Sequence, residues 1–232
     1  MNKLFENPVF SITLTLAVFY LARRLYNRHR WFFFQPVLIT IITIIVVLLL
    51  LDVPYETYKI GADYISFFLG PSVVSLGVLL YEKSALIKKH YKPILIAILA
   101  GSITGLISVV AICLIMQAPH EILVSLAPKS VSTPIAIEIS TLTGGIPSLT
   151  TAVVIMVGIF GAALGVNILR LFGIKSPMAT GLALGAACHG IGTSKALEIS
   201  PLAGVASALA MCINGIITAI LTPWVLSLIQ WL

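Results

Sequence analysis

Long runs of apolar residues, interrupted by few charges, are the feature that most restricts how this chain can fold. Of the 232 residues, 59% are hydrophobic and only 9% are charged, whereas soluble domains carry about 25% charged residues. Several runs approach or exceed the roughly 20 residues that a helix needs to cross a bilayer. The composition therefore predicts an all-α polytopic membrane protein embedded in the lipid bilayer, and it excludes a soluble enzyme.

Six apolar segments are predicted to span the membrane. They cover about residues 8–22, 35–51, 60–81, 93–116, 149–169 and 205–228. Gly70 and Pro71 lie near the middle of the third segment. We expect a kink or a break there, because proline removes a helical hydrogen bond.

The net charge of +6 predicts membrane topology rather than binding to nucleic acid. The basic residues lie mostly in short loops beside the apolar segments, and such loops collect on the cytoplasmic side of a membrane. Three of these loops, Arg23–Arg30, Lys83–Lys92 and Arg170–Lys175, hold ten of the fourteen basic residues.

An internal repeat appears when the chain is offset by sixty residues. "TPIAIEISTLTGG" at 133–145 then lies over "TSKALEISPLAGV" at 193–205, and Gly101 and Gly105 lie over Gly161 and Gly165. Biased composition can produce apolar matches by chance. A matched Glu-Ile-Ser is harder to explain by chance, because carboxylates inside membrane segments are rare and costly.

The repeat suggests a division of the chain into three parts. Residues 1–90 are expected to form scaffold or oligomerisation helices. Residues 91–145 and 146–232 are expected to be repeat units, each with a span followed by a broken helix, and the second also carries the final span.

The broken segments have two structural interpretations. If each is a re-entrant helical hairpin, the three basic loops face one side, as the positive-inside rule prefers. This interpretation predicts six spans and two hairpins that enter from opposite faces, which is an inverted-repeat architecture found in transporters. A crossed pair of unwound helices is the alternative.

The polar breaks at 128–134 and 189–194 are predicted to face the protein interior, since irregular backbone is not tolerated against lipid. Thr133 and Thr193, or the adjacent Ser132 and Ser194, are candidate N-caps. Two helix N-termini would then direct their positive ends at one centre, which suits a small anion. The predicted lining of this pocket comprises Lys129, Ser130, Ser132, Thr133, His189, Gly190, Gly192, Thr193 and Ser194.

Several of these residues also have structural interpretations. Lys129 and Lys195 could each neutralise a glutamate, Glu138 and Glu198 respectively, as intramembrane ion pairs. Both glutamates are expected to brace the breaks or relay a proton rather than touch an anion. His189 could be a hydrogen-bonded core residue or a ligand.

Small and amide residues in the helical segments add further expectations. The repeated glycines, together with Gly181 and Gly185, are expected to let helices approach closely. Asn167 and Asn214 lie within spans and could either bond between helices or approach the site.

No catalytic constellation is recognisable in the sequence. Cys188 beside His189, or His189 near Ser194, does not match a known catalytic spacing. The three cysteines, Cys113, Cys188 and Cys212, have neither a CxxC nor a zinc spacing and are expected to be buried inert thiols. We therefore expect no enzymatic activity, no metal site and no cofactor.

Four stretches resemble the signature regions of a known family. They are "FFLGPSVVSLGVLLY", "PKSVSTPIAIEIS", "GGIPSLTTAVVIMVGIFGAALG" and "ATGLALGAACHGIGTSKALEI". They are similar to the LrgB/CidB family of bacterial inner-membrane proteins and to the carboxy-terminal half of the plastid glycolate/glycerate translocator. The resemblance extends over nearly the whole chain.

The resemblance implies two functions. One is the transport of small monocarboxylates such as pyruvate or glycolate; the other is a holin-like or antiholin-like regulation of murein hydrolase export and autolysis. Both imply a multi-pass protein of the bacterial plasma membrane with an LrgA/CidA-type membrane partner. The duplicated polar breaks favour transport of a small carboxylate anion, with residues 1–90 as a scaffold or dimer surface.

Overall fold

The computed structural model describes residues 7–29, 34–82 and 84–229, and every regular element among them is an α-helix. The chain divides into two compact units, Met1–Gly77 and Val78–Leu232. The predictions made for Arg30 and Lys83 concern positions outside the described residues.

In the first unit, α2 (Pro8–His29) packs against α3 (Pro36–Leu50) and α4 (Tyr55–Phe67). The hydroxyls of Thr15 and Tyr58 lie 2.7 Å apart and join α2 to α4. Helix α2 runs on to His29, so the basic segment that was predicted to be a loop is helical through Arg28. The reason is that arginine is a good helix former and stabilises the negative end of the helix.

The interruption expected near Gly70 and Pro71 is present. Helix α4 ends at Phe67, and α5 (Leu69–Glu82) begins after one intervening residue. Pro71 thus lies in the first turn of α5, where a missing N–H costs no helical hydrogen bond.

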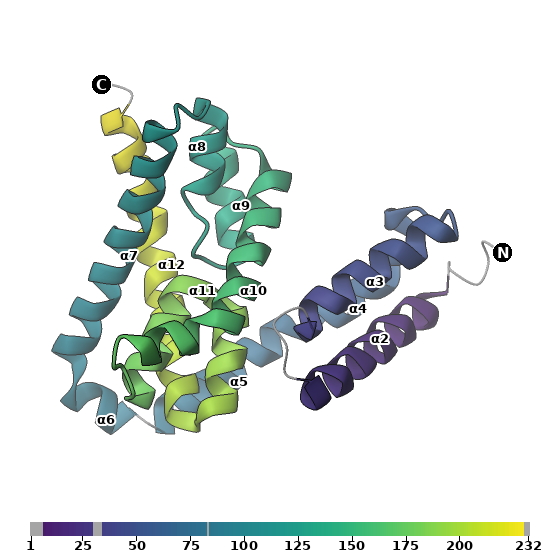
Figure 1. The fold of residues 1–232 in the computed structure, drawn as a ribbon, viewed down its shortest axis with the longest axis horizontal. Helices are drawn as coiled ribbons and strands as arrows, with labels where there is room; N and C mark the ends of the chain where they lie inside the picture. Colours follow the sequence, from purple (N-terminus) through teal and green to yellow (C-terminus); the bar gives the residue numbers. More distant parts are fainter. Residues whose placement is uncertain (1–6, 30–33, 83, 230–232) are drawn as a thin grey trace. The chain divides into compact units, whose positions relative to one another are not determined.

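The second unit is built around three long helices. In chain order its elements are α6 (Ser84–Lys89), α7 (Tyr91–Ile115), α8 (His120–Leu126), α9 (Thr133–Leu142), α10 (Pro147–Leu171), α11 (Pro177–Ile199) and α12 (Pro201–Ile229). Helices α7 and α12 run in the same direction, since Ile98 shares a core cluster with Ala210 while Cys113 shares one with Leu226. They lie side by side in Figure 1.

Helices α8 and α9 form the first hairpin, His120–Leu142. The Thr150 hydroxyl, at the start of α10, lies 3.0 Å from the Ser125 carbonyl oxygen and 2.8 Å from the Ser140 hydroxyl. Ser125 of α8 and Ser140 of α9 are therefore close together, and the chain reverses between them. The reversal occupies residues 127–132, where Pro128 stands and no regular helix forms. This agrees with the predicted break.

Helix α11 is the second hairpin, Pro177–Ile199, because its backbone reverses at His189, with φ 43° and ψ −135°. Ala196 shares a core cluster with Leu184. A continuous helix would separate these two residues by about 18 Å. The second half of α11 therefore returns beside the first half, as the hairpin interpretation predicts.

Close approach in this unit depends on small residues. A Cβ atom at Gly181 or Gly185 would collide with the backbone carbonyl oxygens of Ala203 and Ser207 on α12. A Cβ at Gly161 would collide with the Cys188 side chain, so the predicted role of glycine is confirmed at these positions. At Gly101 the nearest atom would lie at an ordinary 3.7 Å.

Four helices among the described residues are long and apolar enough to cross a membrane: Pro8–His29, Tyr91–Ile115, Pro147–Leu171 and Pro201–Leu228. The shorter Pro36–Leu50 is also apolar. Many large side chains on these helices are exposed, such as Ile96, Ile107 and Phe160. Such surfaces suit lipid, so the chain is a helical membrane protein.

Candidate functional site

The reversals of the two hairpins lie level with the middle of the long helices. A Cβ built on Gly105, which is central in α7, would have the Ser130 hydroxyl of the first reversal as its nearest contact from outside α7. A Cβ built on Gly190, next to the second reversal, would have Met211, in the first half of α12, as its nearest contact. The first hairpin extends from the end where α10 begins and the second from the end where α10 finishes. They reach the centre from opposite ends.

Asn214 of α12 connects the two hairpins. Its Nδ2 donates to the Ser130 carbonyl in the first hairpin and to the Ala186 carbonyl in the second, each at 3.0 Å. Its Oδ1 lies 2.6 Å from the Ser102 hydroxyl of α7. The side chain is only 1% exposed. One amide therefore joins α7, α12 and both hairpins, and its partners fix which amide atom is oxygen, because carbonyls only accept.

Lys129 is a half-buried cation in the reversal of the first hairpin. Its Nζ donates to the Ser130 hydroxyl at 3.0 Å. The alternative pairing with Glu138 is not formed: Glu138 is exposed, and no ion pair of Lys129 is present within the described part of the chain. A cation at this depth is costly without a counter-charge.

His189 is buried and holds the second reversal. Its Nε2 lies 3.0 Å from the Val154 carbonyl oxygen of α10, which only accepts, so Nε2 carries the proton. A positive φ in a residue other than glycine costs on the order of 1–3 kcal/mol, and this hydrogen bond helps to hold it. Gly158 leaves room for the ring, since a Cβ there would lie 2.9 Å from its Cε1. In this structure His189 is a hydrogen-bonded core residue.

Thr193 and Ser194 are not N-caps, contrary to the prediction. Their hydroxyls donate to the carbonyls four residues earlier, His189 and Gly190, at 3.0 and 3.2 Å, as they do inside a helix. The helix resumes directly after His189, so these residues lie one turn past its start. Thr193 is buried and bonds the Ser207 hydroxyl of α12 at 3.0 Å, while Ser194 is exposed.

The first hairpin matches the capping prediction in position. Ser132 is the N-cap of α9, with extended backbone, although its side chain makes no capping hydrogen bond. Thr133 is the first helical residue, and both are half-buried.

The other predicted residues divide between burial and exposure. Gly192 is buried, and a Cβ there would collide with the Leu184 carbonyl, so it serves the hairpin itself. Gly190 is exposed. Lys195 and Glu198 form an ion pair at 2.9 Å on the exposed side of the second hairpin, as one interpretation predicted. Of the cysteines, Cys113 and Cys188 are buried as expected, whereas Cys212 is exposed.

The comparisons with known proteins agree with the sequence resemblance. The model of the LrgB-like family matches residues 15–228. The chain belongs to the LrgB-like family. It is 38% identical to the uncharacterized protein YxaC of Bacillus subtilis (strain 168) over 224 residues, which cover 97% of this chain and 96% of the relative. It is 34% identical to the uncharacterized protein YwbG of the same strain over 219 residues, or 94% and 97% of the two chains. No solved structure matches the chain.

In this LrgB-like protein, α12 carries Asn214, which the sequence singled out, and three further polar candidates that it did not. Buried polar residues recur along one face of the helix: Ser207, Asn214, Thr218 and Thr222. Thr218 donates weakly to Asn214 Oδ1 at 3.4 Å. The sequence could have indicated this polar face by its spacing. Ser207 and Asn214 are about two helical turns apart, and Thr218 and Thr222 follow at intervals of about one turn in an otherwise apolar span.

Proposed function

We propose that this LrgB-like protein transports small monocarboxylates, such as pyruvate or glycolate, across the bacterial plasma membrane. The observation that carries the proposal is Lys129, a half-buried cation at the centre of a membrane unit. The partner of its ammonium group is the neutral Ser130 hydroxyl. Buried charge without compensation is unfavourable, so an anion is the natural complement.

The chemistry around Lys129 fits a small monoanion better than a larger or more highly charged one. One ammonium supplies one charge, and the nearby hydroxyls of Ser130, Ser132 and Thr133 can each donate to a carboxylate oxygen. The start of α9 adds the positive end of a helix. Because Thr193 and His189 already bond to protein, they support the site in this proposal rather than line it.

The proposed mechanism is alternating exposure of this centre. The two hairpins would act as gates that approach from opposite membrane faces, within an inverted repeat and six spans in total, without catalysis. The first unit would supply a dimer or scaffold surface, and an LrgA/CidA-type membrane protein would be the partner. Exposed apolar residues on α2 and α3, such as Leu16 and Ile45, are available for these contacts.

Uptake of labelled pyruvate into vesicles that contain the protein, with and without the small partner, tests the proposal. We expect saturable uptake, and we expect Lys129→Gln to raise the half-saturation concentration about ten- to a hundredfold, since a charge-assisted hydrogen bond contributes about 1.5–3 kcal/mol. Thr133→Val should weaken uptake less, because one neutral bond is lost. Lys88→Gln is the control, as Lys88 is exposed on α6.

A different outcome would support the second function of the family. Leak of unrelated solutes such as sucrose, with no saturation and no response to Lys129→Gln, points to a pore or a regulator of hydrolase release. Saturable uptake that is identical in Lys129→Gln and Lys88→Gln would show that a carboxylate binds elsewhere.

A further inference from the structure

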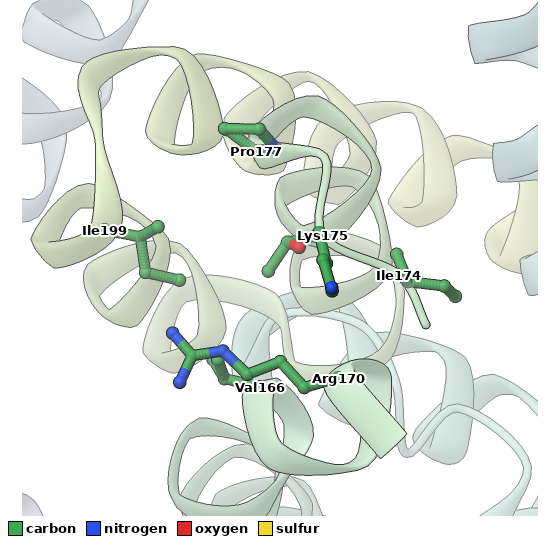
Figure 2. A pocket seen from close by; sticks show the side chains of 7 residues that line it. Val166, Arg170, Ile174, Lys175, Pro177 and Ile199 are labelled. Carbon is green, nitrogen blue, oxygen red and sulfur yellow. The ribbon is translucent and has the colours of Figure 1, made fainter. Parts of the chain in front are cut away.

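A cavity of about 210 Å³ lies at the base of the second hairpin, away from the reversals. Figure 2 shows it between the end of α10 and the start of α11. Its lining comprises Val166, Arg170, Ile174, Lys175, Pro177, Thr180 and Ile199. Three of these residues are polar and four are apolar, so the cavity has a mixed character.

The charge in this cavity is positive and uncompensated. Arg170 ends α10 and Lys175 lies in the loop that follows, and neither forms an ion pair with any residue the structure describes. Glu198, beside the lining residue Ile199, is bound to Lys195 instead. Figure 2 shows the Arg170 and Lys175 side chains among those that line the cavity. The positive end of α11, which begins at Pro177, adds to this field.

Thr180 provides an independent sign of a ligand. The residue is only 6% exposed, yet its hydroxyl has no hydrogen-bond partner among the described residues. The hydroxyl oxygen of Thr180 is not completely covered by protein. Because Thr180 lines the cavity, its hydroxyl opens into it. A hydroxyl that opens into a cavity and has no protein partner is free to donate to a bound acceptor.

The surroundings indicate where the acceptor comes from. Leu171 and Phe172, which join α10 to the loop, are 84% and 76% exposed. In a bilayer such side chains contact acyl chains, while arginine and lysine lie at the headgroup level. Basic pockets of this kind on the cytoplasmic side of membrane proteins bind anionic headgroups.

We propose that this cavity binds the phosphate group of an anionic glycerophospholipid. Arg170 and Lys175 supply the charge and Thr180 donates a hydrogen bond, while the acyl chains lie over Leu171 and Phe172. The binding of a lipid here would brace the base of the second hairpin against α10, and it does not depend on the proposed transport. A free phosphate or carboxylate shares the same chemistry and is distinguished by experiment.

The thermal unfolding of the purified full chain in detergent, titrated with phosphatidylglycerol or phosphatidylcholine, tests the inference. We expect phosphatidylglycerol alone to raise the midpoint. Arg170→Gln/Lys175→Gln should increase the concentration needed by about thirtyfold, and Thr180→Val, which keeps the side-chain shape, by about fivefold. The control Lys88→Gln/Lys89→Gln removes the same charge from exposed positions on α6 and should change nothing.

Three results would overturn the inference. Equal weakening by the control pair would mean diffuse attraction of lipid to basic residues. An equal shift with inorganic phosphate or pyruvate, without lipid, would identify a site for free anions. A Thr180→Val variant that binds phosphatidylglycerol as the wild type does would remove the specific role of the cavity, even if the double variant fails to fold.

Discussion

Replacement of Asn214 by leucine tests the central connection of the second unit most directly. Leucine has a similar volume and suits an apolar interior, so the change removes hydrogen bonds without opening a large cavity. Three strong bonds are lost: those from Asn214 Nδ2 to the carbonyls of Ser130 and Ala186 at 3.0 Å, and that from the Ser102 hydroxyl at 2.6 Å. The weak bond from Thr218 at 3.4 Å is lost as well.

The expected cost follows from these three bonds. Interhelical hydrogen bonds in membrane proteins contribute about 0.6 kcal/mol each on average and about 1.7 kcal/mol at most. Three bonds therefore predict a loss of about 2 kcal/mol in the free energy of unfolding. The Ser102 hydroxyl keeps an alternative acceptor, the Ile98 carbonyl oxygen at 2.8 Å, whereas the two carbonyls of the hairpins lose their bond to Asn214.

The assay is equilibrium unfolding of the purified chain in mixed micelles, and Asn167→Leu is the matched control. Asn167 lies in α10 and is exposed, so the same chemical change there should cost little. Ser102→Ala completes a double-mutant cycle and should show a coupling of about 0.6–1.7 kcal/mol with Asn214→Leu. The reasoning is refuted if Asn214→Leu costs no more than Asn167→Leu.

Two further predictions concern helix contacts in the second unit. Gly181→Ala should destabilise the fold by about 1–3 kcal/mol, because the added Cβ collides with the Ala203 backbone. Gly101→Ala is the control and should be tolerated. A similar fall in thermal midpoint for both variants would contradict this prediction. Lys195→Gln should change the free energy of unfolding by less than about 1 kcal/mol, because the ion pair with Glu198 is partly exposed and such pairs contribute little in water. A larger loss in a denaturant titration would show that this ion pair stabilises the fold.

The sequence predicted the helical elements well, because their signals are local. Apolar length placed the long helices α7, α10 and α12 within a few residues of their observed bounds. Pro128 and Pro134 marked the first reversal, since proline cannot continue a helix interior. Gly181 and Gly185 marked the contact with α12, because only small side chains allow backbones so close together.

The contacts between distant segments could not be predicted in the same way. Thr193 looks like an N-cap in sequence, but its hydroxyl bonds backward to His189 and across to Ser207. The reversal at His189 depends on the Val154 carbonyl, which lies 35 residues earlier. For Asn214 the sequence predicted either bonds between helices or an approach to the site, and the structure shows bonds to two carbonyls that the hairpins place beside it. The repeat itself stays a prediction.

In the proposed transport mechanism, the geometry of Asn214 bears on how the two hairpins could open in turn without a leak. Its two N–H groups hold the two hairpins separately, so one hairpin can leave while the other bond remains. One such bond contributes about 0.6–1.7 kcal/mol, which is a factor of about 3 to 20 in population. A state in which one hairpin has left Asn214 would then be a minor but accessible conformation. A state in which both hairpins have left would be less populated by the product of the two population factors. Asn214→Leu removes both restraints together. In the vesicle assay this variant should therefore lose saturation and admit sucrose, whereas Asn167→Leu should not; a variant that stays tight to sucrose would show that other contacts keep the gates closed.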